Sequence, residues 1–483
     1  MKKITILLTG ASGTMGQAGV AELLKHKDKH NLILFSLPTQ KDKKILAKYK
    51  KENNVKIIWG DLVNYNDVKK AIKGVDIVLH VGALVSPLAD RNPELAWKVN
   101  YGGTKNIVDA ILQRKDNSQV KLVYVGTVAQ TGNRAFPVHW GRVGDPLVPS
   151  VYDYYALSKI AAERYVIESG LKQWVSIRQT GILHTKILSI NDGIAFHQSL
   201  NNHIEWVSAK DSGRLLANIC FKDLPKHFWR KVYNIGGGKC YRLTAYQLMQ
   251  KLLNLMNINL HDIYNPNMFA LRNFHGHFYL DSDKLNEYLN FRSEGLKDIM
   301  QGIKDKLPFY IKLLKYLPKK IVKKHMIKES LKNANTPLYW AKHNDKTKIK
   351  AYFGSIKDWN SIGDWHTFNH IIDPPHITLN HGYDETKKDQ EFVIEDMQKA
   401  AEYRGGKCLS LTMVKGDLHT KLKWLCSEGH EFKASPYLVL KAGHWCSKCV
   451  QSPWNFDQQA KQNDFLAQVW YVDHCRSENN IYQ

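Results

Sequence analysis

Short apolar, β-branched runs alternate with amphipathic stretches along the first 180 residues of the chain. This alternation is typical of parallel strands that are joined and covered by helices. The predicted strands are 4–9, 31–36, 55–59, 75–81, 121–125 and 174–178. The sequence therefore predicts an α/β domain built on a parallel sheet.

The pattern changes twice further along the chain. After about residue 185 the alternation weakens, and loop-like segments follow, with a turn at 233–238 and a helix around 246–255. From about residue 385 a polar amphipathic stretch leads into a cysteine cluster. The predicted parts are a sheet domain at 1–185, a smaller mixed substrate-covering region at 186–385 with some segments returning to the sheet domain, a metal-binding module at 386–460 and a tail at 461–483.

Composition favours a packed protein in a reducing compartment. Apolar residues make up 43% of the chain and aromatic residues 11%, which excludes a disordered chain. No run reaches the roughly 18 apolar residues that a membrane-spanning helix needs, and the apolar stretch at 4–8 is a first strand rather than a signal peptide. Seven cysteines, four of them between Cys408 and Cys449, do not form an evenly spread disulfide framework, so we expect a cytoplasmic location.

The net charge of +24 is unevenly distributed along the chain. Residues 301–350 contain fourteen lysines and only three acidic residues, and 309–328 interleaves these lysines with large apolar side chains. Pro318 predicts the start of a second helix inside this segment. The segment could dock on an anionic membrane and draw an apolar substrate to the protein, and a solvated helical face is the alternative interpretation.

A glycine-rich loop follows the first predicted strand and precedes a helix. Glycine lets the backbone turn sharply and approach a pyrophosphate, while the free N–H groups at the helix start face the anion. A tight turn without a ligand is the alternative, but the position after the first strand of a βαβ series favours a Rossmann-type dinucleotide site. Its candidate residues are Gly10, Ser12, Gly13, Thr14, Met15 and Gly16.

The end of the second predicted strand bears on the choice of cofactor. An NAD-binding domain usually places an acid there, on the ribose 2′-hydroxyl. Here the strand ends at Ser36, and Lys41, Lys43 and Lys44 follow closely enough to meet a 2′-phosphate. The sequence therefore favours NADP, with NAD as the alternative.

Tyr155 and Lys159 lie four residues apart in a stretch with helical spacing. They share one helical face, so the ammonium can stabilise a phenolate, which a tyrosine with a pKa of about 10 requires to exchange protons near neutrality. An ordinary amphipathic helix would give the same spacing. The glycine loop and the strand that ends at Gly126-Thr127 favour the catalytic interpretation.

Together these motifs resemble the extended branch of the short-chain dehydrogenase/reductase superfamily over about residues 4–250. Gly60-Asp61-Leu62, His80-Val81-Gly82-Ala83 and Asn100-Tyr101-Gly102-Gly103-Thr104 resemble further marks of that family. The resemblance implies that Tyr155 donates or accepts the proton, that Lys159 lowers its pKa and holds the nicotinamide ribose, and that Thr127 hydrogen-bonds the reacting oxygen. It also implies cofactor contacts from Asp61, Leu62, Val81, Gly82, Ala83 and Asn100.

Departures from the family patterns narrow the reaction. Dehydratases of the family have an Asp-Glu pair after the catalytic threonine, whereas Val128-Ala129 follows here. Nucleotide-sugar epimerases have an asparagine that Arg178-Gln179-Thr180-Gly181 lacks. We therefore expect an NADP(H)-dependent oxidoreductase that is similar to the hydroxysteroid-type members and acts on a carbonyl or secondary alcohol of a small-molecule, apolar substrate. A nucleotide-sugar epimerase is the alternative, and the sequence leaves a homodimer open.

Two ligand pairs predict a zinc site near the carboxyl end. Cys426-x3-His430 and Cys446-x2-Cys449 resemble small zinc-ribbon modules, with Cys408 as an alternative ligand to His430. Four protein ligands make such a site structural. A cofactor-binding regulator that contacts nucleic acid through this module is a competing hypothesis, disfavoured because no base-reading helix is evident. The separate histidines His366, His370, His376 and His381 are interpreted as loop or packing residues.

Overall fold

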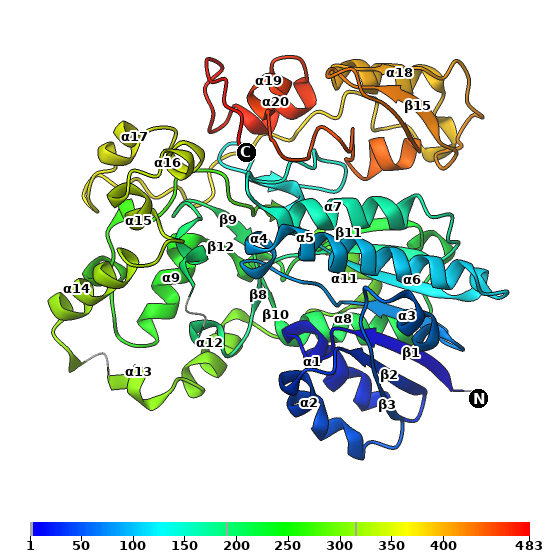
Figure 1. Cartoon of the computed structure of the whole chain (residues 1–483), viewed down its shortest axis with the longest axis horizontal. Coiled ribbons are helices and arrows are strands. Elements are labelled where there is room, and N and C mark those ends of the chain that lie inside the picture. The colour runs from blue at the N-terminus through cyan, green and yellow to red at the C-terminus, as the bar shows by residue number, and fades with distance from the viewer. Residues whose placement is uncertain (1–2, 190–191, 314–315) are drawn as a thin grey trace.

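Seven parallel strands form the central sheet, in the order β11-β7-β5-β4-β1-β2-β3 (Figure 1). The structure is a computed structural model and describes residues 3–189, 192–313 and 316–483. The strands are β1 (Ile4–Thr9), β2 (His30–Ser36), β3 (Val55–Trp59), β4 (Ile77–His80), β5 (Lys121–Thr127), β7 (Trp174–Gln179) and β11 (Lys231–Ile235). The predicted α/β class with a doubly wound, Rossmann-type sheet is confirmed.

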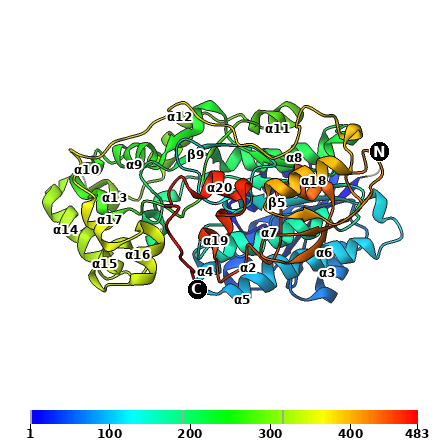
Figure 2. The same cartoon turned by 90° about the horizontal axis from the view of Figure 1, so that it is seen from above.

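Alternate strand residues face two different layers of the core. Leu7, Val78 and Leu122 pack on the side covered by α3 (Tyr65–Ile72), α6 (Gly103–Leu112) and α7 (Tyr154–Ile167). Their strand neighbours, Ile6 and Leu8 among them, face the other side, which is covered by α1 (Thr14–Leu23), α2 (Gln40–Leu46), α8 (Ala209–Phe221) and α11 (Ser282–Leu289). Because side chains alternate along a strand, both faces of the sheet are buried (Figure 2).

The edge strand β11 lies where the sequence predicted the beginning of a turn. Residues Tyr233–Ile235 pair in parallel with β7 and are buried, so only the glycines that follow form the turn. That part of the prediction was wrong, because the run gains its strand conformation from β7, which is distant in sequence. Three elements after residue 185, namely β11, α8 and α11, pack in the sheet domain.

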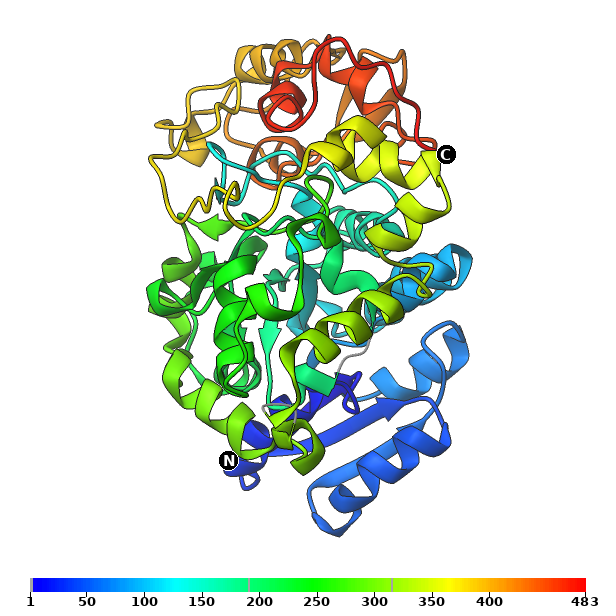
Figure 3. The same cartoon turned by 90° about the vertical axis from the view of Figure 1, so that its left-hand side faces the viewer.

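The predicted substrate-covering region is mostly helical; it lies beside the sheet domain in Figure 1 and faces the viewer in Figure 3. Three short strand pairs form outside the central sheet: β8 (Ile182–Leu183) with β10 (Val207–Ser208), β9 (His203–Glu205) with β12 (Arg242–Thr244), and β6 (Trp140–Gly141) with β13 (Phe278–Tyr279). The helices of the predicted substrate-covering region are α9 (Ala245–Asn254), α10 (Leu260–Ile263), α12 (Leu296–Asp305), α13 (Phe309–Leu313), α14 (Lys319–Ser330), α15 (Pro337–Lys342), α16 (Lys346–Phe353) and α17 (Ile356–Ser361). Pro318 caps the start of α14, as predicted, while Leu314 and Lys315 lie outside the described residues.

The carboxyl-terminal module covers the α7 side of the sheet domain (Figure 1). It contains α18 (Ile394–Tyr403), the antiparallel strands β14 (Lys407–Cys408), β15 (Leu422–Leu425) and β16 (Glu431–Ala434), and the π-helical turn Tyr437–Lys441. The final helices are α19 (Phe456–Ala460) and α20 (Asp464–Trp470). Trp424 and Leu438 of the module share one core with Trp174 of β7. Among the described residues, no helix combines the length and apolar character needed to cross a membrane.

Candidate functional site

The glycine loop lies at the carboxyl end of β1, against the loop that follows β4. Gly10 has a φ of +69°, and a Cβ there would lie 2.7 Å from the Cα of Gly82. A Cβ at Gly16 would lie 2.1 Å from the carbonyl oxygen of Gly10. Both glycines are therefore required by the protein's own packing.

Gly13 differs from these two glycines. A Cβ at Gly13 would meet only the carbonyl oxygen of Gly10, at 3.4 Å, and Gly13 is exposed at the N-cap of α1. No side chain caps α1, and no acidic residue lies in its first turn. The open backbone at the helix start therefore fits the phosphate groups of a dinucleotide.

A buried polar chain holds the loop after β4 in place. The Thr9 hydroxyl accepts a hydrogen bond from the Gly82 backbone N–H (2.9 Å) and contacts His80 Nδ1 (2.9 Å), and His80 Nε2 contacts the Thr104 hydroxyl (2.9 Å). Burial lowers the pKa of His80 to about 3, so its ring is neutral. The predicted contacts at Val81, Gly82 and Ala83 therefore lie beside the glycine loop. Sequence reasoning missed Thr9, because hydrogen bonding across a sheet leaves no local signal.

Asn100 is buried between this loop and helix α7. Its side-chain amide donates to the Leu84 carbonyl (2.9 Å) and the Ser158 hydroxyl (2.9 Å), and its oxygen accepts from the Leu84 backbone N–H (2.7 Å). Ser158 in turn donates to the Tyr155 carbonyl (2.7 Å). Asn100 thus connects the loop after β4 to α7, and its side chain is held by hydrogen bonds within the protein.

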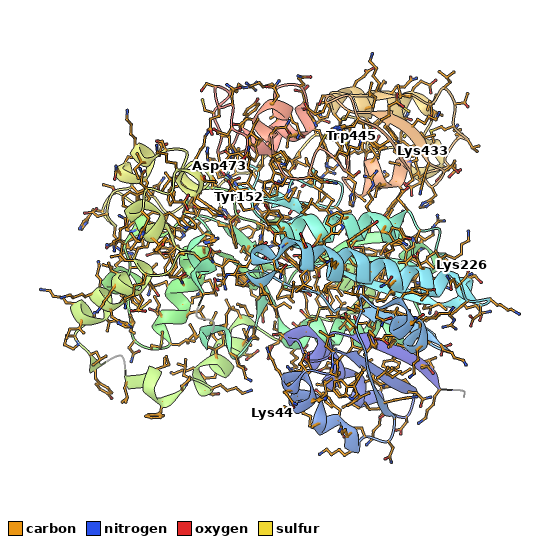
Figure 4. All side chains as sticks on the ribbon, in the orientation of Figure 1. Lys44, Tyr152, Lys226, Lys433, Trp445 and Asp473 are labelled. Carbon is orange, nitrogen blue, oxygen red and sulfur yellow. The ribbon has the colours of Figure 1, made fainter. Side chains whose placement is uncertain are left out.

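The adenosine side of the predicted cofactor site is polar and partly basic. Ser36 ends β2 and is followed by the exposed residues Lys41, Lys43 and Lys44 at α2, where Figure 4 shows Lys44 at the edge of the molecule. Asp61 follows β3, and its carboxylate accepts from the Val63 backbone N–H (3.0 Å). The end of β2 therefore carries the Ser36 hydroxyl and no carboxylate, as the sequence indicated.

The predicted catalytic residues come together at the carboxyl end of β5 and the start of α7. Thr127 ends β5, and its side chain lies next to that of Tyr155, the second residue of α7, whose pKa it lowers. Lys159 is buried one turn later, with its Nζ 4.2 Å from the centre of the Tyr124 ring. Asp153 caps α7 by accepting from the Ala156 backbone N–H (2.7 Å), and Asp90 accepts from the Tyr155 backbone N–H (3.1 Å).

Burial sets the proton affinities of these groups. It raises the pKa of Tyr155 to about 12; the neighbouring Thr127 side chain opposes this rise, while Asp153 and Asp90 add to it. Burial lowers the pKa of Lys159 to about 7, against the attraction of Glu163. Burial and Asp153 raise the pKa of Asp90 to about 7. Tyr155 therefore keeps its proton at neutral pH, whereas Lys159 and Asp90 titrate near it.

The predicted zinc ligands meet in one cluster. The ligand atoms of Cys426, His430, Cys446 and Cys449 lie within 4.8 Å of one another. His430 Nδ1 lies 3.4 to 3.6 Å from the three sulfurs, and the sulfurs of Cys426 and Cys449 are 3.5 Å apart. Tetrahedral zinc, with Zn–S of about 2.3 Å, places its ligand atoms roughly 3.3 to 3.8 Å apart. The four side chains therefore fit a zinc ion and would fill its coordination.

Local turns explain how these ligands converge. Cys426 and His430 flank the β15–β16 turn, where Gly429 has a φ of +75° and its N–H donates to the Cys426 carbonyl (3.0 Å). Cys446 and Cys449 occupy a second turn. Cys408 lies outside the cluster, because β14 pairs it with Trp424 and its sulfur contacts the Ser410 carbonyl instead (3.9 Å).

The separate histidines lie in the loop after α17 and contact other side chains. His370 contacts the Thr244 hydroxyl (2.9 Å), His376 stacks on Trp140, and His381 contacts Asp145 (2.8 Å). His366 lies in the same loop. None of the four belongs to the one candidate metal cluster found among the described residues.

Comparison with known proteins agrees with the geometry of the sheet domain. Residues 7–186 match the 3-beta hydroxysteroid dehydrogenase/isomerase family. Over 175 residues the chain is 28% identical to 3 beta-hydroxysteroid dehydrogenase type 7 of Rattus norvegicus, an alignment that covers 35% of this chain and 49% of the relative. Over 178 residues it is 31% identical to short-chain dehydrogenase/reductase family 42E member 1 of Macaca fascicularis (35% and 41%). The chain thus spans less than half the length of these curated relatives.

Solved structures share the fold over a longer stretch. The match to the dTDP-glucose 4,6-dehydratase of Bacillus anthracis, in complex with NAD, spans 62% of this chain and 96% of the chain of that structure, with a TM-score of 0.51 and 18% identity. DesIV of Streptomyces venezuelae, with NAD and TYD bound, covers 63% and 98%, with a TM-score of 0.51 and 20% identity. These two structures show that the fold is shared, and the sequence matches over residues 7–186 confirm the resemblance to the short-chain dehydrogenase/reductases for the sheet domain.

Proposed function

We propose that the protein is an NADP(H)-dependent oxidoreductase of the extended short-chain dehydrogenase/reductase type. The observation that carries the proposal is the meeting of Thr127, Tyr155 and Lys159 at the carboxyl edge of the sheet, on the same edge as the glycine loop after β1. Ligands of open parallel sheets bind at this edge. The active-site groups and the cofactor loop are thus on one side of the molecule.

The side chains suit the reduction of a carbonyl to an alcohol. The Thr127 and Tyr155 hydroxyls would bind the substrate oxygen, and the dinucleotide, when bound, supplies the hydride that reaches the carbonyl carbon. Tyr155 gives its proton to the oxygen, so one carbon–hydrogen and one oxygen–hydrogen bond form as the carbonyl π bond breaks. In the reverse direction Tyr155 accepts the proton, and the Lys159 ammonium favours its ionised form.

NADP is the proposed dinucleotide, and NAD is the alternative. The absence of an acid at Ser36 and the exposed lysines of α2 support a 2′-phosphate on the ribose. Zinc is the proposed metal at Cys426, His430, Cys446 and Cys449, where it would stabilise the fold and take no part in the chemistry.

Cofactor binding and turnover test the proposal together. We would titrate the purified protein with NADPH and NADH, then assay ketones, including steroid-like ones, and nucleotide sugars. Tyr155→Phe should lower kcat about 100-fold or more, as expected for loss of a general acid. Tyr154→Phe is the matched control, since Tyr154 packs on Trp454. Tyr155-independent turnover would contradict the assigned role, turnover of nucleotide sugars alone would favour the epimerase, and absence of dinucleotide binding would favour the regulator.

A specific surface supports peripheral membrane contact as a second proposal. Phe309 is 76% exposed and Ile321 59%, while Lys320, Lys324 and Lys328 are exposed on α14. Val322 and Ile327 of α14 are partly buried and pack on the core of the predicted substrate-covering region. An apolar edge bordered by lysines is complementary to an anionic lipid surface.

Vesicle co-sedimentation tests this second proposal. Binding to phosphatidylserine vesicles and not to phosphatidylcholine vesicles is expected, and it should weaken when Lys320, Lys324 and Lys328 are changed to Gln. Changing three lysines elsewhere, Lys41, Lys43 and Lys44, to Gln is the control. Equal binding by both triple variants and the wild type would contradict the proposal.

A further inference from the structure

The carboxyl-terminal module packs directly on the catalytic helix α7. Arg164 of α7 donates to the Trp445 carbonyl (2.7 Å), and the Glu168 carboxylate, at the end of α7, accepts from the Ser435 hydroxyl (2.5 Å). Figure 4 shows Trp445 and Lys433 above this helix. The helix that carries Tyr155 is therefore covered by residues that lie far later in the sequence.

A buried carboxylate on α7 is the centre of these contacts. Glu163 follows Lys159 by four residues and is fully buried with Arg178, its ion-pair partner. Four side chains from three parts of the protein donate to it: Arg178 Nη2 (2.7 Å), Ser176 Oγ (2.5 Å), Gln130 Nε2 (3.0 Å) and His444 Nε2 (3.0 Å). A buried charge with several donors has little freedom to move, because losing any donor is costly.

The same network reaches two of the predicted catalytic residues. Gln130, which donates to Glu163, also accepts from the Thr127 backbone N–H (2.8 Å). Glu163 is the group that raises the pKa of Lys159 against its burial. A Cβ at Gly126 would lie 2.8 Å from Gln130 Oε1, so the glycine leaves room for the Gln130 side chain between Thr127 and Glu163. Glu163 therefore bears on both the position of Thr127 and the charge of Lys159.

The module's side of this contact is a short segment that ends in the metal cluster. The Ala442 carbonyl accepts from Arg178 Nη2 (2.7 Å), His444 donates to Glu163, and the Trp445 carbonyl accepts from Arg164. The next residue, Cys446, is one of the four metal ligands. Metal binding would fix the end of this segment.

We propose that the zinc centre positions the catalytic helix, with His444 as the positioning residue that joins the two. Zinc holds the segment 442–446, and His444 holds Glu163, which keeps Thr127 in place and Lys159 charged. The inference rests on the proposed oxidoreductase function. It adds a role for the carboxyl-terminal module, which supplies none of the groups that take part in the proposed reaction. His444 does not touch the substrate.

Substitution of His444 by two side chains separates positioning from packing. His444→Leu removes the donor to Glu163, and we expect about a tenfold or larger loss of kcat, the equivalent of ~1.4 kcal/mol in the barrier. His444→Gln can place an amide N–H near the original Nε2, so it should restore most of the loss. His343→Gln, on the exposed end of α15, is the matched control and should retain full activity.

The pH profile distinguishes an effect on Lys159 from a general weakening of the fold. The groups that face Lys159 are His80 from β4 and Tyr124 from β5, both neutral, and Glu163 from α7. Glu163→Gln removes the one negative charge among them, so the pKa of Lys159 should fall. The alkaline limb of kcat/KM should then move about one pH unit lower, with a smaller movement in His444→Leu.

Zinc content and NADPH affinity are measured on the same samples. Retained zinc with reduced kcat in His444→Leu supports the proposal, and so does parallel loss of kcat when a chelator removes zinc from the wild type. Full activity of His444→Leu, or of zinc-free protein, in an enzyme whose turnover depends on Tyr155 would overturn it. Wild-type protein that neither binds NADPH nor reduces a ketone would instead overturn the proposed function.

Discussion

Gly13→Ala separates cofactor binding from stability, because the protein itself leaves room for the added methyl group. The new Cβ would meet only the Gly10 carbonyl oxygen, at 3.4 Å, and the backbone at Gly13 (φ −73°, ψ 172°) is allowed for alanine. We therefore expect the free energy of unfolding to change little, or to rise by about 0.4 to 1 kcal/mol through the lower entropy of the unfolded chain.

The same methyl group would stand where the pyrophosphate approaches the start of α1. Loss of a charge-assisted hydrogen bond costs about 1.5 to 3 kcal/mol, so Kd for NADPH should rise roughly 10- to 100-fold. Fluorescence titration with NADPH and thermal denaturation of the same sample give the two quantities. Gly16→Ala is the contrasting variant: its Cβ would lie 2.1 Å from a backbone oxygen, so it should lose stability as well.

The two variants together make the reasoning refutable. Unchanged NADPH affinity in Gly13→Ala would show that the glycine loop is not the phosphate site. A large fall in its melting temperature would show that the space around Gly13 is not open. Equal stability of Gly13→Ala and Gly16→Ala would contradict the packing argument for both positions.

Three further predictions concern the cofactor, the buried lysine and the metal. Ser36→Asp should repel a 2′-phosphate and reverse the preference from NADPH to NADH, as measured by Kd for both; an unchanged ratio would argue against the assigned role of Ser36. Lys159→Met should abolish turnover yet raise the melting temperature near pH 7, because burial lowers the lysine's pKa from 10.5 to about 7. Between these two pH values the lysine is protonated in the unfolded chain and neutral in the folded protein, so the stability of the wild type rises with pH across this range. The higher melting temperature of Lys159→Met should therefore disappear near pH 10.5. A difference in melting temperature that does not change with pH would contradict this prediction. Cys449→Ser should release zinc, as metal analysis would show, and lower the melting temperature; full zinc retention would exclude Cys449 as a ligand.

Local sequence patterns predicted much of the candidate site. Gly10 and Gly16 lie within one strand–turn–helix unit, Tyr155 and Lys159 lie one helical turn apart, and Cys446 and Cys449 occupy one turn. In each case the chemistry depends on residues a few positions apart, so spacing alone carries the signal. The two halves of the metal cluster are also close in sequence: only residues 431–445, which contain β16 and the turn Tyr437–Lys441, lie between His430 and Cys446.

Long-range contacts decided what the sequence left open. Residues 233–235 became strand β11 because β7 pairs with them, and His430 rather than Cys408 joined the cluster because β14 places Cys408 beside Trp424. His444 and Glu163 are 281 residues apart, yet they share a buried hydrogen bond. The sequence by itself determined the sheet class, the glycine loop, the Tyr155–Lys159 pair and the two candidate metal-ligand pairs, since these follow from local geometry. Only the tertiary structure decided that the carboxyl-terminal module covers α7, because no periodicity along the chain encodes which distant surfaces bury one another.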